Sequence, residues 1–340
     1  MQVVTVGLDL AKSVFQLHGV DAHGKTVLAK RLRRGAVLGF FASLPSCVVG
    51  MEACGTAHHW AREIAKLGHA VRLLPPRYVK PCVKRQKNDA ADAEAICEAV
   101  QRPTMRFVPV KTEEQQGLLV IHRVREMLVR QRGQLINALR GHLAEFGIVA
   151  PQGSHRVCDL TARLADPGDE MIPASARAVL QVLVDQLRDT GRRIDELDGR
   201  LQAQARSDEV CRRLMTIPGV GPITATALAA TIGDAKAFAP GPHLAAWMGL
   251  VPRQRSSGGK ERLGGISKAG DGYLRRLLVQ GAQALLRWRS RATPWIEGLL
   301  RRRPVNVAAV AIANKTARIT WAVMVRGEAY SRPEAVAVAG

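Results

Sequence analysis

Two carboxylates lie three residues apart in the stretch Lys87-Asn88-Asp89-Ala90-Ala91-Asp92-Ala93-Glu94, an alanine-rich run that favours a helix. Side chains at positions i and i+3 share one face of a helix, so Asp89 and Asp92 can point toward the same spot. Carboxylates that close repel each other unless a cation lies between them or one of them is protonated, and Mg²⁺ is the simplest candidate for such a cation. The same pattern is typical of a helix start, with Asn88 or Asp89 as N-cap. Taken alone, the helix start is the better explanation.

Two further acids upstream favour the functional interpretation. The β-branched run 3–9 ends on Asp9, and the apolar run 47–52 ends on Glu52. More strands are predicted at 14–20, 25–32 and 71–74, with helices at 35–44 and 58–67. The pattern predicts an α/β domain with a mixed sheet that opens with a three-stranded meander. If the first strand neighbours the fourth, Asp9 and Glu52 are adjacent, and the helix carrying Asp89 and Asp92 can pack across them.

Four acids from three separate elements describe a two-metal phosphoryl-transfer site of the ribonuclease H type. Each acid also has a structural explanation. Asp9 alone is more typical of a strand-end turn, and Glu52 alone is typical of a surface residue. It is the combination, in this order, that favours catalysis.

The charge of the chain points to nucleic acid. Its 50 Lys and Arg against 29 Asp and Glu give a formal charge of +21 and a pI near 10.7. A membrane-surface protein can be as basic, but no apolar run is long enough to span a bilayer and the N-terminus resembles a strand rather than a signal peptide. We therefore expect a cytosolic protein with no membrane partner. The six cysteines form no Cys-x-x-Cys pair, so they are expected to be reduced.

From residue 111 the pattern becomes helical. Apolar residues recur at steps of three, four and seven over 111–147, with Arg123 and Arg130 among the basic residues on the other faces. A loop rich in proline and glycine follows, and a second long helix is predicted over 174–204 with near-heptad spacing. The two helices predict an arm, either an antiparallel hairpin or an intermolecular coiled coil. Its basic face suits a nucleic-acid grip, a dimer contact or simple solvation.

The segment Ile217-Pro218-Gly219-Val220-Gly221-Pro222 is typical of a helix-hairpin-helix. Gly219 and Gly221 permit a tight turn between two helices, and the amides that open the second helix can accept a phosphate oxygen. Such a module grips the nucleic-acid backbone without reading its sequence. A Gly-x-Gly turn between helices also occurs without a ligand, but the positive charge favours phosphate.

A basic loop rich in glycine and serine lies between two helical segments. It carries Ser256, Ser257 and Ser267, and its cations, with those of the helix that follows, are Arg253, Arg255, Lys260, Arg262, Lys268, Arg275 and Arg276. A flexible linker is the simplest explanation of such a loop. However, cations around an exposed hydroxyl are what a nucleophile that attacks a phosphodiester needs.

Several motifs together resemble those of the DEDD transposases of insertion sequences. They are Gly7-Leu8-Asp9-Leu10-Ala11-Lys12, Gly50-Met51-Glu52-Ala53-Cys54-Gly55, Lys87 to Ile96, Ile217 to Pro222, and Gly249-Leu250-Val251-Pro252 through Ser257-Gly258-Gly259-Lys260. The resemblance runs over almost the entire chain, and the motifs are specific jointly rather than singly.

The resemblance implies three domains: a RuvC-like (RNase H-like) domain over 1–110, a helical coiled-coil arm over 111–205, and a mainly α C-terminal transposase domain with the helix-hairpin-helix over 206–340. In such enzymes an Asp, Glu, Asp, Asp tetrad binds Mg²⁺ or Mn²⁺, and here it falls on Asp9, Glu52, Asp89 and Asp92. The C-terminal domain supplies a serine nucleophile, carried over to Ser257, with Ser256 and Ser267 as alternatives. The serine forms a covalent phosphoserine link.

The resemblance also implies partners: donor and target DNA, a structured bridge RNA that pairs with both, and further copies of the chain in a dimer or tetramer. Two competing hypotheses stay open. A Holliday-junction-type endonuclease would hydrolyse DNA with the carboxylates and metal alone, but it leaves the Ser257 loop unexplained. A non-enzymatic nucleic-acid binder leaves the four acids unexplained, since carboxylates near phosphate do not favour binding.

Overall fold

The computed structural model describes residues 2–84, 88–151, 153, 156–238, 240–288 and 293–331; Lys87 of the opening motif lies outside them. The chain divides into two compact units, Met1–Gln116 and Gly117–Gly340. Within the described residues, no helix combines the length and the apolar character needed to cross a membrane.

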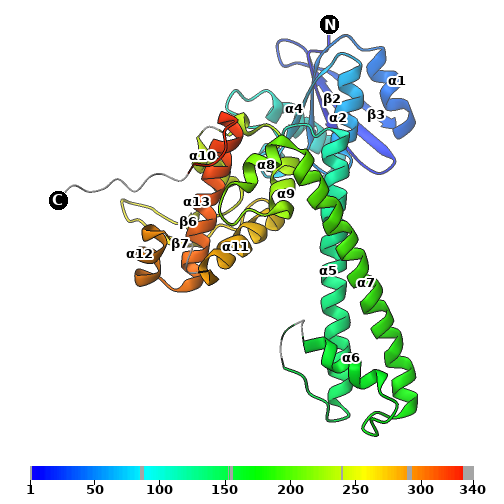
Figure 1. Cartoon of the computed structure of the whole chain (residues 1–340). Helices are drawn as coiled ribbons and strands as arrows, with labels where there is room; N and C mark the ends of the chain where they lie inside the picture. The colour runs from blue at the N-terminus through cyan, green and yellow to red at the C-terminus, as the bar shows by residue number, and fades with distance from the viewer. Residues whose placement is uncertain are drawn as a thin grey trace, which may run out of the picture. The chain divides into compact units, whose positions relative to one another are not determined.

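A five-stranded mixed sheet forms the centre of the first unit, with strand order β3-β2-β1-β4-β5 (Figure 1). The strands are β1 (Thr5–Asp9), β2 (Val14–Val20), β3 (Thr26–Arg33), β4 (Val48–Glu52) and β5 (Ala70–Leu74). The meander makes β1 antiparallel to β2, while helical crossovers make β1 parallel to β4 and β4 parallel to β5. The predicted mixed α/β sheet is confirmed, and its first and fourth strands are neighbours, which is the condition on which the adjacency of Asp9 and Glu52 depended.

Short helices connect and cover these strands. They are η1 (Arg34–Ala36), α1 (Val37–Ala42), α2 (Ala57–Lys66), α3 (Pro76–Val79), η2 (Lys80–Cys82) and α4 (Asp89–Val100). On one side of the sheet, Phe15 packs edge to face on Trp60 of α2, with ring centroids 4.9 Å apart. A separate group of buried side chains, including Ile96 and Val100, fixes α4 and η2 to the sheet.

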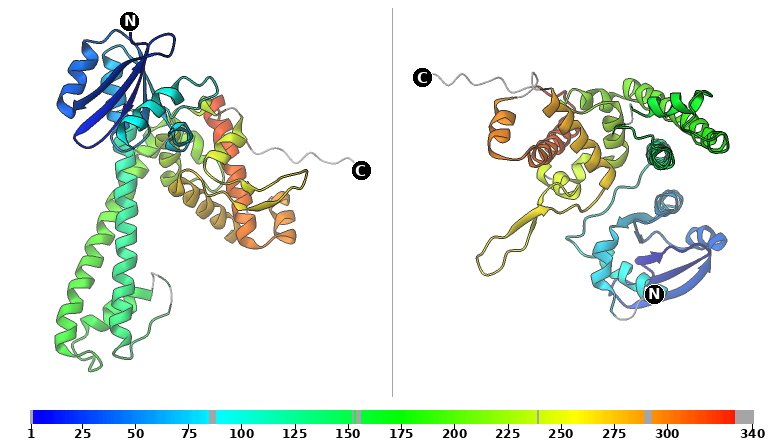
Figure 2. Two further views of the ribbon diagram at one scale, coloured as in Figure 1. Left: turned by 180° about the vertical axis from the view of Figure 1, so that it is seen from behind. Right: turned by 90° about the horizontal axis from the view of Figure 1, so that it is seen from below.

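The arm consists of α5 (Glu113–Ala144) and α7 (Ala174–Ser207), two long helices that lie side by side (Figures 1 and 2). Arg125 of α5 forms an ion pair with Asp198 of α7. Where the sequence predicts a loop, the chain forms α6 (Val157–Ala165), which buries Val157, Leu160 and Leu164. These apolar residues at i, i+3 and i+7 make a helical stripe that packs with leucines of α5 and α7.

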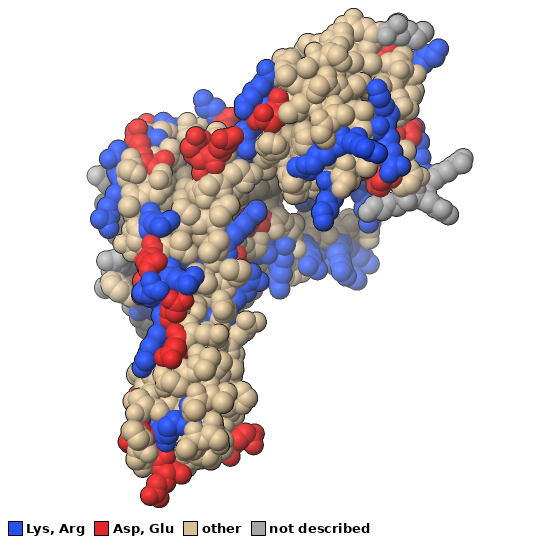
Figure 3. Space-filling model, turned by 90° about the vertical axis from the view of Figure 1, so that its right-hand side faces the viewer, with Lys and Arg blue, Asp and Glu red and all other residues tan. Residues whose placement is uncertain are grey.

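Acids and bases are interspersed along the arm rather than separated (Figure 3). Asp189 of α7 pairs with both Arg192 and Arg193, and Arg192 also pairs with Glu196. Because these exposed pairs neutralise one another, the basic residues of α7 are better explained as a solvated helix face than as a phosphate grip.

The remainder of the second unit is mainly helical, as predicted. Its elements are α8 (Glu209–Met215), α9 (Pro222–Ile232), η4 (Ala235–Ala237), α10 (Gly241–Trp247), β6 (Pro252–Gln254), β7 (Leu263–Ile266), α11 (Gly272–Arg287), α12 (Pro294–Arg302) and α13 (Val305–Arg326). They surround one apolar core that contains Leu214, Leu228, Leu244, Leu274 and Ala313. The basic segment differs from the predicted loop, because its two ends pair as the antiparallel hairpin β6–β7 (Figure 2).

Candidate active site and nucleic-acid interface

Two glycines allow α4 to pack directly on the sheet. A Cβ atom on Gly7 of β1 would lie 2.1 Å from the carbonyl oxygen of Ala93 and 2.5 Å from the amide nitrogen of Cys97. A Cβ atom on Gly50, the partner of Gly7 in β4, would lie 2.8 Å from Cβ of Val100. No real side chain tolerates these distances, so α4 can cross β1 and β4 only because both positions are glycine.

The contacts of α4 fix the direction in which it runs. Its Cys97 thiol lies 3.8 Å from the carbonyl oxygen of Thr5 at the start of β1, whereas Ala93 lies against Gly7 further along the strand. The helix therefore approaches its N-terminus as β1 approaches Asp9. This places Asp89 and Asp92, in the first turn of α4, at the end of the sheet where β1 finishes.

Asp9 and Glu52 end neighbouring parallel strands, and the preceding residues Leu8 and Met51 are register partners. Cys54 reports their proximity. Burial raises the pKa of its thiol, and the negative charges of Glu52 and Asp9 raise it further. Both acids are half-buried. The structure thus brings all four predicted acids to one edge of the sheet.

Asn88 is the N-cap of α4, because its side chain accepts a hydrogen bond of 2.8 Å from the amide of Ala91. Asp89 and Asp92 are thus not needed as caps. Glu94 on the same helix has a different environment: Lys84 contacts it at 2.7 Å, and this hydrogen bond lowers the pKa of Glu94. Glu94 therefore has Lys84 as its ionic partner and is not one of the four predicted acids.

The donor set at this edge is composed of carboxylate oxygens, which are the ligands that Mg²⁺ and Mn²⁺ prefer. The residues therefore fit a hard divalent cation in their chemistry. Throughout the described ranges, however, no three His, Cys, Asp or Glu side chains gather closely enough to enclose a metal ion. Asp89 is exposed and Asp92 is half-buried.

Ser257 lies at the tip of the β6–β7 hairpin. It precedes Gly258 and Gly259, whose φ angles of 57° and 76° are those of the mirror-image two-residue turn. The turn is closed by a 3.1 Å hydrogen bond from the Lys260 amide to the Ser257 carbonyl. The side chain of Ser257 is exposed, and its hydroxyl has no hydrogen-bond partner among the described residues.

The two alternative serines are engaged within the hairpin. The Ser256 hydroxyl accepts a hydrogen bond of 3.2 Å from the Arg262 amide. The Ser267 hydroxyl accepts one of 3.4 Å from the Ala269 amide at the base of the hairpin. Geometry thus favours Ser257, because its hydroxyl is the one at the tip that contributes nothing to the hairpin.

The predicted phosphate contacts divide into free and engaged cations. The side chains of Arg123 and Arg130 on α5 and of Arg255, Lys260, Arg262 and Lys268 on the hairpin are exposed, whereas Arg253 donates a 3.4 Å hydrogen bond to the Ser267 carbonyl. Arg275 donates to the carbonyl oxygens of Met248 and Ala269 at 2.9 and 3.0 Å, and Arg276 pairs with Glu126. Arg275 therefore holds the base of the hairpin.

Gly219 and Gly221 connect α8 and α9 in the manner the sequence predicts, but Gly219 has a packing role. Its φ is 84°, and a Cβ on Gly281 of α11 would lie 2.1 Å from the Gly219 carbonyl oxygen. The turn is therefore pressed against α11. Gly221 is the N-cap of α9, with Pro222 in its first turn. Phosphate binding by this turn stays a prediction.

A buried polar network went undetected in the sequence. His122 of α5 is 1% exposed, and its two ring nitrogens lie 3.0 Å from the Tyr273 hydroxyl and 3.1 Å from the Thr226 hydroxyl. Burial lowers the pKa of His122 to about 4, so the ring is neutral at pH 7. The network attaches α5 to α9 and α11. The only signal was one histidine on the apolar face of a predicted helix.

Comparisons with known proteins show which family the sequence resembles. A DEDD-type model of the IS110 group, described as a transposase, matches residues 6–148, and a model described as the transposase IS116/IS110/IS902 family matches residues 211–295. A probable family 20 transposase of Pseudomonas aeruginosa is 50% identical, covering 97% of this chain and 99% of its own.

Two further relatives are transposases for named insertion sequence elements. The IS1328 transposase of Yersinia enterocolitica is 44% identical, over 97% of this chain and 99% of its own. The IS1111A transposase of Coxiella burnetii is 43% identical, over 96% and 90%. With four acids brought to one sheet edge and matches of this extent, the chain belongs to the IS110 family of DEDD transposases of insertion sequences.

Proposed function

We propose that this transposase cuts and rejoins DNA with two sets of groups. Asp9, Glu52, Asp89 and Asp92 hold Mg²⁺ or Mn²⁺, and Ser257 is the nucleophile. The packing of α4 across Gly7 and Gly50 carries the proposal, since it delivers four acids from three elements to one edge. The free hydroxyl of Ser257 at the hairpin tip supports the second part.

In the proposed reaction the Ser257 oxygen attacks a DNA phosphorus and loses its proton. The bond from phosphorus to the 3′ oxygen breaks, the leaving oxygen takes up a proton, and the 5′ phosphate stays on the serine as an ester. When bound, the divalent cation supplies neutralisation of the charge that develops on the phosphate oxygens. A 3′ hydroxyl from another strand then attacks the phosphoserine, which joins the strands and restores Ser257.

Lys260 and Arg255 are suited to stabilise this charge from the hairpin itself. Both side chains are exposed, and Lys260 pairs across the turn with Ser257. A guanidinium and an ammonium near the attacking oxygen lower the cost of forming it and attract the phosphate. The hairpin thereby supplies the nucleophile together with part of its electrostatic environment.

The proposal extends to the partners. A net charge of +21 suits a chain whose proposed partners, donor DNA, target DNA and a structured bridge RNA, are all polyanions. Exposed Arg123 and Arg130 on α5, and the turn at Gly219 and Gly221, are proposed backbone contacts. The arm of α5 and α7 is proposed to join copies of the chain in a dimer or tetramer.

A second candidate is a metal-dependent junction endonuclease without a covalent step. One observation favours it: all four acids belong to the first unit, so hydrolysis by a metal-activated water requires no group from the second. The two candidates differ in their dependence on Ser257.

Labelled DNA that carries the element end, run on a denaturing gel with the full chain and Mg²⁺, tests the choice. We expect a protein–DNA adduct that disappears in Ser257→Ala and persists in the matched control Ser256→Ala. Asp9→Asn should abolish both the adduct and cleavage. Cleavage that survives Ser257→Ala without an adduct would favour the endonuclease, and activity that survives Asp9→Asn would reject the acidic site.

A further inference from the structure

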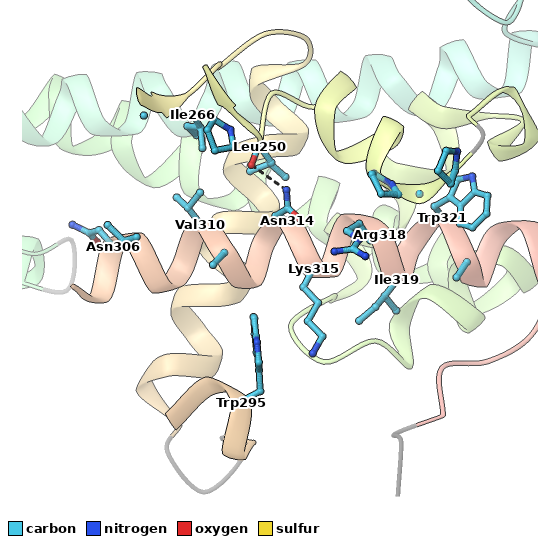
Figure 4. A pocket seen from close by; sticks show the side chains of 18 of the residues that line it. Leu250, Ile266, Trp295, Asn306, Val310, Asn314, Lys315, Arg318, Ile319 and Trp321 are labelled. Carbon is cyan, nitrogen blue, oxygen red and sulfur yellow. Dashed lines mark hydrogen bonds between the residues drawn. The ribbon is translucent and has the colours of Figure 1, made fainter. Parts of the chain in front are cut away.

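A large cavity lies in the second unit, on the side of α13 that faces the base of the β6–β7 hairpin. It measures about 1130 Å³ and is lined by α13, α12, the start of α10 and both hairpin strands (Figure 4). Its walls are largely apolar, with Val310 of α13 on one side and Ile266 and Leu250 on the other (Figure 4). No part of the proposed catalytic chemistry uses this cavity.

Polar groups converge on this cavity from successive positions of α13. Asn314, Lys315 and Arg318 all line it; Asn314 points toward Leu250, whereas Lys315 extends to the other side of the helix, toward Trp295 (Figure 4). The Asn314 amide donates a 3.1 Å hydrogen bond to the Leu250 carbonyl, which fixes the side chain and orients its remaining polar atoms. The side chains of Lys315 and Arg318 are exposed, and no acidic side chain lines the cavity among the residues that the structure describes. The charge therefore favours an anion.

An exposed aromatic ring completes the site. Trp295 of α12 is 40% exposed and lines the cavity, and the Lys315 ammonium lies 4.2 Å from the centroid of its ring. Trp321, in contrast, donates its indole N–H to the Phe238 carbonyl and packs against Gly241. Trp321 is thus a fixed wall, whereas Trp295 is partly exposed, with Lys315 over one face of its ring.

The same two side chains border a second cavity. Trp295 and Lys315 also line a hollow of about 610 Å³ whose other wall is the turn from Met215 to Val220. The Trp295–Lys315 pair thus lies between the base of the hairpin on one side and the Gly219 turn on the other. A chain that contacts both elements passes this pair.

We propose that this cavity binds an unpaired nucleotide of a single-stranded nucleic acid, with its base against Trp295 and its phosphate between Lys315 and Arg318. The inference rests on the proposed function, since it takes nucleic acid to be the ligand of the chain. An aromatic face accepts any base by stacking, and a nearby cation pair accepts the phosphate. In a duplex each base is stacked on its neighbours, so its face is not available to Trp295. The site therefore selects single strands.

Tryptophan fluorescence of the full chain tests the inference, with a single-stranded oligothymidylate of about eight nucleotides as the ligand. We expect quenching on binding. Trp295→Phe should lose the quenching but keep most of the affinity, because a phenyl ring still stacks. Trp295→Ala should weaken binding about tenfold. The matched control is Trp288→Phe, a tryptophan outside the cavity that is more exposed than Trp295, which should leave quenching and affinity unchanged.

Further arms identify the source and exclude other occupants. Oligouridylate of equal length shows whether RNA or DNA is preferred, and a duplex of equal length should not quench. Lys315→Ala and Arg318→Ala should each reduce the slope of log affinity against log salt by about one, whereas Arg326→Ala at the end of α13 should leave the Trp295 signal intact. The apolar dye bis-ANS should be displaced by the oligonucleotide.

Three results overturn the inference: equal quenching by duplex, quenching that persists in Trp295→Phe, or dye that stays bound when the oligonucleotide binds. The last would indicate an apolar partner. Failure here is distinguishable from failure of the proposed chemistry. If only this site is wrong, the Ser257 adduct still forms on the labelled element-end DNA. If only the proposed chemistry is wrong, the adduct is absent but the oligonucleotide still quenches Trp295.

Discussion

The two groups of residues that are proposed to act on DNA lie in different units and are built in opposite ways. Two of the carboxylates lie at the ends of buried parallel strands, and the other two lie in the first turn of α4. This helix packs closely on the sheet because Gly7 and Gly50 have no side chains. Ser257 lies on an exposed hairpin of two short strands, closed by a tight turn. Rigid packing suits ligands of a metal, which need fixed geometry, whereas an exposed hairpin suits a group that must reach a substrate. The contrast predicts that mutations damage the two parts by different mechanisms.

The largest effect is expected from Gly7→Ala. The new methyl group would meet the backbone of α4 at 2.1 Å, so the helix has to move and Asp89 and Asp92 move with it. We expect at least ~3 kcal/mol of lost stability, and loss of DNA cleavage. Urea unfolding and cleavage assays measure both.

Gly39→Ala in α1 is the matched control, because a Cβ there meets nothing within 4 Å. It should be neutral or slightly stabilising. Equal stability of Gly7→Ala and Gly39→Ala would contradict the close packing of α4.

The next largest effect is expected from acid pH, which acts on buried His122 of the second unit. The pKa of buried His122 is about 4 when folded, against 6.5 for the unfolded chain. The unfolded state therefore binds a proton first as pH falls below 6.5, so the contribution of His122 to stability declines until pH 4. The loss amounts to about 3 kcal/mol.

Unfolding of the wild type and of His122→Gln between pH 7 and 4 measures this difference. At pH 7 the variant should be less stable than the wild type, because the two buried hydrogen bonds of His122 are altered. It should, however, lose less stability than the wild type on acidification. Parallel pH profiles of the two proteins would show that His122 is not the titrating group.

Arg275→Ala is expected to have an intermediate effect confined to the hairpin. It removes two hydrogen bonds to the carbonyl oxygens of Met248 and Ala269, which costs about 2 kcal/mol. Formation of the Ser257 adduct should fall while the sheet of the first unit keeps its hydrogen-exchange protection. Arg287→Ala, an exposed arginine on the same helix, is the control. Loss of protection in β1 or β4 would show that the two parts are not independent.

The smallest effect is expected at the turn itself. Gly258 has a φ of 57° with open space around it, so Gly258→Ala suffers conformational strain of about 1 kcal/mol and no clash. Gly258→Asn should cost less, because asparagine tolerates this conformation. Thermal unfolding should barely change while strand transfer falls several-fold. A collapse in stability comparable to that of Gly7→Ala would remove the distinction between the two parts.

Local pattern was sufficient to predict most of the first unit. The β-branched runs that end on Asp9 and Glu52 gave strands close to their observed bounds, and Asn88 caps the helix as its type suggests. The adjacency of the two acids followed only on the condition that the first strand neighbours the fourth, and the strand order of the sheet meets that condition. The spacing of Asp89 and Asp92 then placed both at the same edge.

What the sequence did not reveal depends on contacts between distant residues. The packing of Gly219 on Gly281 and the bonds of Arg275 to Met248 and Ala269 have no local signature. The hairpin was predicted as a loop because β6 and β7 are only three and four residues long and β7 contains two glycines, so neither has the pattern of a strand. Likewise, His122 is a single residue on the apolar face of α5, and its partners Thr226 and Tyr273 lie more than a hundred residues away along the chain.

The tight turn at Gly258 and Gly259 has a consequence for how Ser257, the proposed nucleophile, would be delivered. Because Ser257 and Lys260 are paired directly across the two strands, their side chains project from the same face of the hairpin. Any movement that carries the hydroxyl to a scissile phosphate carries the ammonium to that phosphate as well. The hairpin therefore cannot present its reactive oxygen without simultaneously bringing the counter-charge, and an insertion between the two glycines would uncouple attack from charge compensation.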